Sequence, residues 1–184
     1  MRTSSETMTA NGDSAPMGLQ ASHLDAATFK AVLGHYAAGV AVITTTWHDA
    51  PMGFTVSSFT SVSLDPPLVA FCIAETASTW PAISVARGFV VHILGDHQHG
   101  ISALFARSGA DRFGATTRWT PSAGGLPILD DVLAYLECDV ETIVSAGDHR
   151  IVLGRPTRGQ HVVANPAPLV YFRGSYRGLT PLDA

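Results

Sequence analysis

Short runs of β-branched and aromatic residues, closed by turn-forming residues, most strongly restrict the fold of this 184-residue chain. They occupy residues 40–47, 68–74, 89–94 and 132–143. Gly, Pro, Asp or Ser stands near the ends of each run, a pattern typical of strands rather than helices. Residues 52–64, 149–153 and 169–172 are expected to add further strands, with 40–47 and 52–64 forming a hairpin. The chain is therefore expected to be mainly β, an antiparallel barrel.

Three short helices are expected around this barrel. The first follows the N-cap Asp25, carries apolar residues at helical spacing and ends at Gly39. The second begins after Ser78 and Thr79, has a proline in its first turn and ends at Gly88. The third covers residues 98–106, and residues 111–127 are expected to be mostly loop.

Composition and charge exclude several classes of protein. Because 46% of the residues are hydrophobic and 14% are charged, the chain has enough apolar material for one domain, expected at residues 24–184. A net charge of −4 without a basic block argues against a nucleic-acid partner. No apolar run is long enough for a membrane span. Residues 1–23 are polar and lack the apolar core of a signal peptide, so a flexible tail and a cytoplasmic protein are expected.

Motifs of several common enzyme classes are missing. The sequence has no dinucleotide fingerprint, P-loop, zincin motif or nucleophile elbow. Its eight histidines include His97 and His99, but no carboxylate or cysteine set at suitable spacing completes a metal site, so no metal is expected. Cys72 and Cys138 lie in apolar runs and are expected to be small buried residues without a disulfide.

Two groups of hydroxyl side chains suggest a ligand. Residues 55–63 contain six Ser or Thr residues within a segment otherwise suited to burial. Buried hydroxyls need partners, which are either cross-strand Ser and Thr pairs or a planar polar ligand such as a flavin. Ser78 and Thr79, at a helix start, either cap the helix or receive a phosphate. A phosphorylated cofactor accounts for both groups together.

Other charged residues have simpler interpretations. Glu137, Asp139 and Glu141 alternate along one strand and are expected to form a solvated face, opposite Leu136, Cys138 and Val140. The arginine-containing segment 107–119 is open to three readings: a grip on a second phosphate or adenine, a mobile lid, or a surface loop.

Five ordered motifs resemble a known family. They are GFTVSSFTSVSLDPPLVAFCI from Gly53, FVVHIL from Phe89, DRFG from Asp111, GDHRIVLG from Gly147 and PLVYFRGSY from Pro168. Together they resemble the flavin reductase-like family of FMN-binding split barrels, which includes reductase components of two-component flavin-dependent monooxygenases. The resemblance implies a six-stranded antiparallel split β-barrel with Greek-key-like connections and short peripheral helices. It also implies a homodimer that binds FMN or FAD near the subunit interface.

The resemblance assigns roles to particular residues. It places the flavin ring and ribityl chain against Gly53, Thr55, Val56, Ser57, Ser58, Ser61 and Ser63. It places the flavin phosphate at Ser78 and Thr79, and a closing loop at Arg112 and Phe113. It places NADH or NADPH against the catalytic His149 and against Tyr171, Arg173, Gly174 and Tyr176. His92 departs from the family, which more often has asparagine there, and this puts one local hydrogen bond in question.

The expected reaction agrees with the missing motifs. Hydride transfer from a nicotinamide to a flavin requires the two rings to be stacked and oriented, and it requires no protein nucleophile. The chain is thus expected to be an NAD(P)H:flavin oxidoreductase that supplies reduced flavin to a partner monooxygenase. Two alternatives remain at this stage. One is a non-catalytic flavin-binding protein, and the other is a flavoenzyme that keeps its flavin and acts on a small substrate.

Overall fold

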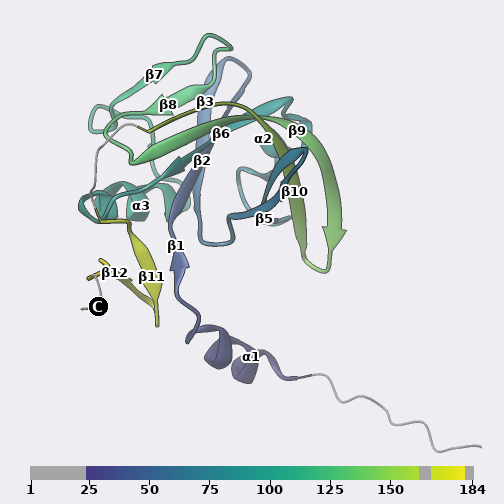
Figure 1. Ribbon diagram of the computed structural model, residues 1–184, viewed down its shortest axis with the longest axis vertical. Helices are drawn as coiled ribbons and strands as arrows, with labels where there is room; N and C mark the ends of the chain where they lie inside the picture. Colours follow the sequence, from purple (N-terminus) through teal and green to yellow (C-terminus); the bar gives the residue numbers. More distant parts are fainter. Residues whose placement is uncertain (1–23, 162–166, 181–184) are drawn as a thin grey trace, which may run out of the picture.

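Seven strands form one curved sheet in the order β3-β2-β6-β9-β10-β5-β4, and every neighbouring pair is antiparallel (Figure 1). The computed structural model describes residues 24–161 and 167–180, so the expected tail at residues 1–23 lies outside the described residues. The strands are β2 (Ala41–Trp47), β3 (Ala50–Val56), β4 (Thr60–Leu64), β5 (Pro67–Ala74), β6 (Gly88–Ile93), β9 (Ala134–Ala146) and β10 (His149–His161). The predicted mainly β, antiparallel fold is confirmed.

The two outer strands of this order, β3 and β4, follow each other in the chain. They are not hydrogen-bonded to each other, and residues 57–59 connect them. The prediction of one strand over residues 52–64 is therefore wrong, because the chain turns at Ser57 and pairs with β5 from Thr60 onward. If β3 and β4 are counted as one interrupted strand, the barrel has the six strands expected, and the interruption is its split.

Smaller elements surround the barrel. They are α1 (Ala26–Leu33), β1 (Ala38–Gly39), α2 (Trp80–Val85), the 3₁₀ turn η1 (Asp96–Gln98), α3 (His99–Ala106), β7 (Trp119–Pro121), β8 (Pro127–Leu129), β11 (Val170–Phe172) and β12 (Ser175–Arg177). β7 lies within residues 111–127, the segment expected to be mostly loop, and β8 begins at the last residue of that segment. Among the described residues, no helix has the length and apolar character needed to cross a bilayer.

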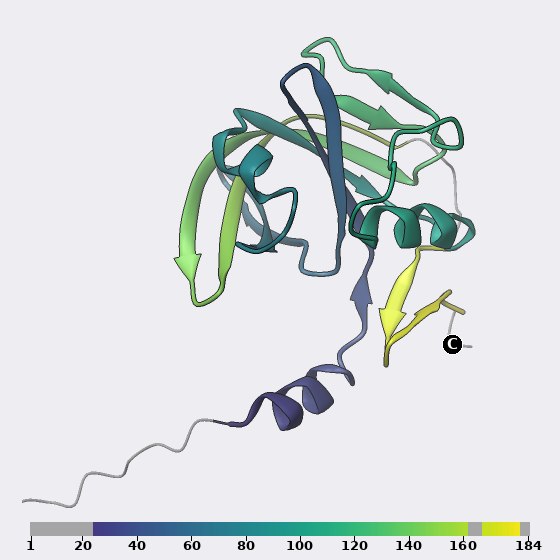
Figure 2. The same ribbon diagram turned by 180° about the vertical axis from the view of Figure 1, so that it is seen from behind.

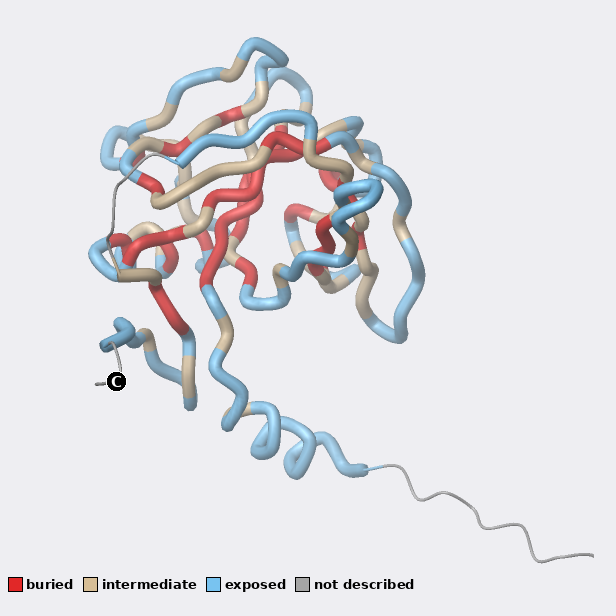
Figure 3. Tube along the Cα trace, viewed as in Figure 1, coloured by how far each residue is buried: buried red, intermediate tan, exposed pale blue. Residues whose placement is uncertain are grey.

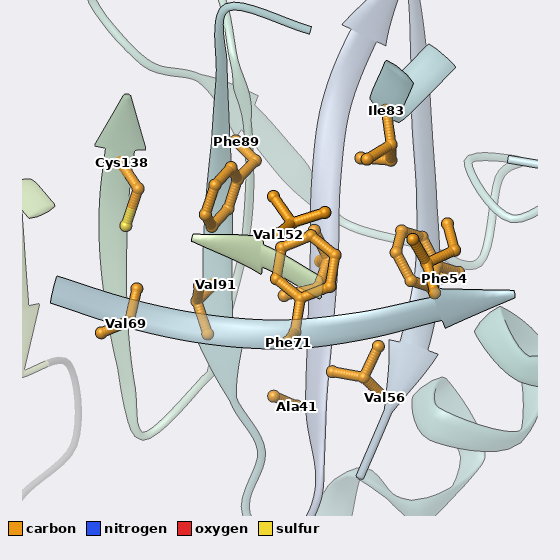
Figure 4. Close-up of a cluster of buried hydrophobic side chains, with 12 residues drawn as sticks. Ala41, Phe54, Val56, Val69, Phe71, Ile83, Phe89, Val91, Cys138 and Val152 are labelled. Carbon is orange, nitrogen blue, oxygen red and sulfur yellow. The ribbon is translucent and has the colours of Figure 1, made fainter. Parts of the chain in front are cut away.

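Both faces of the chain are covered where β2 begins, which explains the apolar run from Val40 to Ile43. Ala41 and Ile43 face the barrel interior, whereas Val40 and Val42 belong to a second cluster that includes Phe105 of α3. The interior cluster is centred on three phenylalanines in edge-to-face contact (Figure 4). The ring centroids of Phe71 lie 5.9 Å from Phe54 and 5.1 Å from Phe89.

A glycine in β10 makes room for this aromatic core. A Cβ atom at Gly154 would lie 2.3 Å from Cζ of Phe89, well inside van der Waals contact. The pairing of β10 with β9 also shifts register between Leu153 and Gly154. The barrel wall therefore approaches the Phe89 ring at a position where any added side chain would have to displace the ring.

His92 satisfies both of its ring nitrogens inside the protein. Its Nδ1 lies 3.1 Å from the Val42 carbonyl oxygen, and its Nε2 accepts from the Leu129 N–H at 3.1 Å. The ring is therefore neutral, with the proton on Nδ1. Burial lowers the pKa of His92 to about 4. The histidine in place of asparagine therefore has both ring nitrogens hydrogen-bonded, and His92 links β2, β6 and β8.

The acidic residues of β9 are on the expected face but only partly in solvent. Leu136, Cys138 and Val140 belong to the barrel interior. Opposite them, Glu141 forms a two-pronged ion pair with Arg155, whereas Glu137 is only 8% exposed. The expected fully solvated face is therefore wrong at Glu137, because this part of β9 lies between β6 and β10 beside residues 123–126.

The two cysteines differ in their surroundings. Cys138 is buried as expected, and burial raises the pKa of its thiol to about 12. Cys72 is only half-buried, contrary to the prediction, because it lies near the end of β5 where a cavity opens.

The first helix projects away from the barrel (Figures 1 and 2). Asp25 caps it as predicted, accepting hydrogen bonds from the backbone of Ala27 and Thr28. It ends at Leu33 rather than near Gly39, and none of its residues is buried (Figure 3). Its C-terminal end is connected to the β11–β12 turn, where the Arg173 N–H donates to the Gly34 carbonyl.

Candidate functional site

A cavity of about 530 Å³ opens where the ends of β3 and β5 meet the start of β10. We call this cavity the cleft. It lies across the split of the barrel, between strands that are not hydrogen-bonded to each other. The structure brings eight of the predicted site residues to it: Thr55, Val56, Ser57, Ser58, Ser78, Thr79, Arg112 and His149. Its volume is in the range of small-molecule and cofactor sites.

The hydroxyls of the 55–63 segment are divided between structural and available groups. Ser58 Oγ accepts from the Cys72 N–H at 2.9 Å and donates to the Cys72 carbonyl, so this hydroxyl holds the connection to β5. Thr55 Oγ1 donates to the Ser102 carbonyl at 2.7 Å, which leaves it only acceptor capacity toward a ligand. Ser57 is exposed, and its hydroxyl makes no hydrogen bond within the described part of the chain. Some hydroxyls of this segment are therefore paired within the protein, and others remain available to a ligand.

The start of α2 contributes less than expected. Thr79 is the N-cap residue, as predicted, but its side chain makes no capping hydrogen bond. The helix has only six residues, so its summed dipole is small. Ser78 is exposed in the cleft, and Thr79 is buried beside it. This part of the wall presents hydroxyl groups rather than a strong helix N-terminus.

Arg112 is the cationic side chain of the cleft. Its Nη2 donates to the Arg107 carbonyl at 2.7 Å, which holds the guanidinium in place. Its Nε is buried and has no hydrogen-bond partner, and no carboxylate pairs with it among the described residues. Burial lowers the pKa of Arg112, although an arginine stays charged near neutral pH. A guanidinium that lines the cleft without a carboxylate partner fits an anionic group such as a phosphate.

His149 lines the cleft at the first position of β10, and Asp148 fixes its ring. The two side chains meet at 2.7 Å between Nδ1 and Oδ1. The hydrogen bond and charge of His149 lower the pKa of Asp148. With Nδ1–H donating to the carboxylate, Nε2 is the ring nitrogen that remains for a ligand.

A smaller cavity of about 180 Å³ adjoins the cleft and shares Thr55, Val56 and Ser57 with it. Tyr171 and Tyr176 line this second cavity, with their rings in edge-to-face contact at 5.5 Å. The Tyr176 hydroxyl lies 2.9 Å from Ser102 Oγ, and the Ser102 carbonyl accepts from Thr55. These contacts connect β12 through α3 to β3.

The remaining predicted residues lie outside the cleft. Gly53 packs under Phe105, and a Cβ there would lie 2.8 Å from that ring, so its role here is close packing. Phe113 packs edge-to-face against both Phe105 and Trp119 in the second apolar cluster. Ser61 and Ser63 lie on β4, at the outer edge of the sheet. Arg173 and Gly174 form the β11–β12 turn, where Arg173 contacts His35 at 3.0 Å.

Several cleft residues were not predicted from the sequence. They are Phe105 and Ala106 from the end of α3, Ser108 after it, and Cys72 and Thr76 near the end of β5. These residues lie near the ends of α3 and β5, which meet at the cleft in the folded protein. The sequence pattern does not show that these two elements meet. Within residues 24–161 and 167–180, no cluster of three or more metal-ligating side chains occurs.

Comparison with known proteins places the chain in a family. Residues 33–180 match the flavin reductase like domain. The chain belongs to the flavin reductase-like family. The reductase subunit HsaB of a flavin-dependent monooxygenase from Mycobacterium tuberculosis is 40% identical over 86% of this chain and 84% of the relative. An NADH:FMN oxidoreductase from Rhodococcus erythropolis is 39% identical over 85% of this chain and 83% of the relative.

A solved member of the flavin reductase-like family has the same fold. The NADH:FAD oxidoreductase of Streptomyces globisporus, in complex with NAD and FAD fragments, superposes with a TM-score of 0.80 at 30% identity. The superposition covers 85% of this chain and 94% of that protein. The split-barrel prediction is therefore confirmed by a relative as well as by the sheet order.

Proposed function

We propose that this flavin reductase-like protein binds FMN or FAD in the cleft and reduces it with NADH or NADPH. The reduced flavin then passes to a partner monooxygenase. The observation that carries the proposal is the cleft itself, in which small polar groups of Thr55, Ser57 and Ser78 face Arg112 and His149 across one cavity. The names of the relatives support NADH as donor, with FMN in one and FAD in another.

The described residues fit a phosphorylated flavin. Arg112 offers the positive charge of a guanidinium without a carboxylate partner to the phosphate, and Ser57 and Ser78 offer free hydroxyls along the path to it. Thr55 accepts a hydrogen bond from a ring N–H, because its own proton is committed to Ser102. A bound flavin accepts a hydride from the nicotinamide and carries the electrons. The protein contributes orientation and a shielded cleft.

His149 and the two tyrosines are placed for the nucleotide. His149 Nε2 donates or accepts at the cleft wall, since Asp148 holds Nδ1. Tyr171 and Tyr176 form a narrow aromatic wall beside the flavin segment 55–57, suited to a planar ring. Arg173 lines neither cavity and is therefore assigned no contact with the nucleotide phosphate in this chain alone.

A homodimer and a cytoplasmic setting complete the proposal. α1 has no buried residue, and Phe29, Val32 and Tyr36 on it and just after it are each more than half exposed. Exposed apolar residues at helical spacing need a covering surface. A second copy of the chain supplies this surface. We call α1 and the residues that follow it the arm. Gly34 of the arm is hydrogen-bonded to the β11–β12 turn, next to the cavity that Tyr171 and Tyr176 line.

The first experiment measures NADH and NADPH oxidation under air with FMN, FAD and riboflavin added in turn. Multiple turnovers that depend on added flavin are expected. Flavin binding without oxidation of either nucleotide would instead indicate a non-catalytic flavin-binding protein. Oxidation that needs no added flavin, by protein purified with a bound one, would indicate an enzyme that keeps its cofactor.

Arg112→Gln tests the assignment of the phosphate. The variant is expected to raise the Kd for FMN about 10- to 100-fold, the usual effect of losing a charge-assisted hydrogen bond, and to leave the Kd for riboflavin unchanged. Arg87→Gln removes the same charge from an exposed residue outside the cleft and serves as the control. Equal weakening of FMN and riboflavin would show that Arg112 shapes the cleft without contacting phosphate.

A further inference from the structure

The two tyrosines beside the cleft stand outside the barrel sheet. They line the smaller cavity of about 180 Å³, which we call the tyrosine cavity. Tyr171 on β11 and Tyr176 on β12 are cross-strand partners in a separate three-stranded sheet of order β1-β11-β12. Figures 1 and 2 show β11 and β12 below α3 and apart from the barrel strands. β3, which carries Thr55, belongs to the seven-stranded sheet, so no strand ladder within the described residues fixes the distance between Thr55 and the two rings.

β12 has one side-chain hydrogen bond to the rest of the protein. Backbone hydrogen bonds of Val40 and Leu169 join the small sheet to the barrel just before β11 begins. Beyond that junction, β12 pairs with β11 alone among the described strands. Within residues 24–161 and 167–180, Tyr176 is the only residue of β12 whose side chain forms a hydrogen bond, and its partner is Ser102 of α3.

Ser102 contacts the two sides of the site through two different groups. Its Oγ lies 2.9 Å from the Tyr176 hydroxyl oxygen, and its backbone carbonyl accepts from Thr55 Oγ1 at 2.7 Å. Ser102 is fully buried and lines neither cavity, whereas Thr55 lines both of them. One buried residue thus holds Tyr176 and Thr55 at a fixed separation.

The hydrogen bond to Ser102 restricts the Tyr176 ring. The ring is held at its hydroxyl end as well as at its Cβ end, so it cannot swing into the tyrosine cavity. Its edge-to-face contact with Tyr171, at 5.5 Å between centroids, extends this restriction to the second ring. The shape of the tyrosine cavity therefore depends on the Ser102 hydroxyl.

We propose that Ser102 is a positioning residue for the nucleotide, because its hydroxyl holds Tyr176 where the nicotinamide ring meets the flavin ring. This role rests on the proposed function, with the flavin at Thr55 and the nicotinamide at the two tyrosines. In that reaction a hydride leaves C4 of the nicotinamide with its electron pair and reaches N5 of the flavin, so the nucleotide is oxidised and the flavin is reduced. A misplacement of about 1 Å lowers the rate of such a transfer about 100-fold.

The two contacts of Ser102 can be separated by mutation. Ser102→Ala removes the hydroxyl but keeps the backbone carbonyl, so the hydrogen bond from Thr55 remains. Tyr176→Phe removes the Ser102–Tyr176 hydrogen bond from its other end. If this bond carries the effect, the double variant is no worse than either single variant. Ser84→Ala is the control, because Ser84 Oγ donates to the Pro81 carbonyl at 2.9 Å and Ser84 lines neither cavity.

The expected result separates flavin binding from nucleotide binding. Without nucleotide, both single variants and the double variant bind FMN with the wild-type Kd. With FMN bound, their Kd for NAD⁺ rises about 5-fold, the effect of losing one hydrogen bond. Reduction of the bound flavin by NADH in anaerobic stopped flow slows about 10-fold. FAD or the NADP(H) pair replaces these compounds where the wild-type protein prefers them.

Thermal unfolding of the free protein reports on the hydrogen bond itself. Each single variant is expected to lower the Tm by about 2–4 °C, and the double variant by no more than either. A serine with a purely structural role would lower the Tm and leave the ratio of the Kd for NAD⁺ to the Kd for FMN unchanged.

Two results would overturn the role of Ser102. One is wild-type NAD⁺ binding and flavin reduction in Ser102→Ala. The other is an additive loss in the double variant, because the two residues would then not act through their hydrogen bond. A failure of the proposed function looks different, since the wild-type protein itself would neither bind NAD⁺ beside FMN nor reduce flavin, and the role of Ser102 would fall with it.

Discussion

At the scale of the residue, His92 is the buried histidine of the described chain, and its surroundings determine how stability depends on pH. Both ring nitrogens are used in the neutral form, and burial lowers the pKa to about 4 from an ordinary value of 6.5. The unfolded chain therefore binds a proton more readily than the folded chain between pH 6.5 and 4. This contribution to stability is complete above pH 6.5 and is lost as the pH falls toward 4.

The pH dependence is measurable by chemical unfolding. Over this interval the wild-type protein is expected to lose about 3 kcal/mol of unfolding free energy through His92, at 1.36 kcal/mol for each pKa unit. His92→Asn removes the titration and flattens the profile, while lowering stability at neutral pH because the hydrogen bond to Leu129 is lost. His99→Asn, at an exposed position, is the control and is expected to keep the wild-type slope.

The same scale shows what single residues reveal about the site. Thr55, Ser57 and Ser58 of the hydroxyl-rich segment line the cleft, and the sequence singled them out because such a cluster in an apolar segment needs partners. It did not show that the Ser58 hydroxyl is consumed by the backbone of Cys72. That pairing depends on the turn after β3, and a pattern of residue types carries no information about which hydroxyls the turn engages.

At the scale of the element, the strands were predicted from their composition, and their interruptions were not. β2, β5 and β6 agree with the expected runs to within one residue at each end. The break at residues 57–59 was missed because Ser and Thr occur on both sides of it, although Ser57 and Ser58 interrupt the alternation of polar and apolar residues there. The extension of β10 to His161 was missed because Gly154, Pro156 and Gly159 disguise a strand whose register shifts at bulges.

Gly154 has a measurable role in β10. Gly154→Ala would place a methyl group against the Phe89 ring and is expected to cost about 1–3 kcal/mol of unfolding free energy through overpacking. Gly39→Ala, where a Cβ meets no atom within 4 Å, is the matched control and is expected to stay within about 0.5 kcal/mol of wild type. Equal effects of the two changes in urea unfolding would show that the barrel wall relaxes around the added methyl group.

At the scale of the whole molecule, the exposed arm formed by α1 predicts self-association. Phe29→Glu with Val32→Glu places two charges on its apolar face and is expected to shift the protein from dimer to monomer. Ala31→Glu adds a charge to the same helix beside this face and is the control. Sedimentation velocity at several concentrations distinguishes the species. A wild-type protein that sediments as a monomer throughout would contradict the proposed dimer.

The split of the barrel has a mechanical consequence. β3 and β4 have no ladder of hydrogen bonds between them, so opening this seam breaks none of the strand-to-strand backbone hydrogen bonds that hold the other neighbouring strands together. The cleft spans the seam, with the end of β3 on one side and the end of β5 on the other. A molecule bound in the cleft contacts both sides of the seam and therefore hinders its opening. Its binding is expected to slow the exchange of backbone amide hydrogens at the ends of β3 and β5.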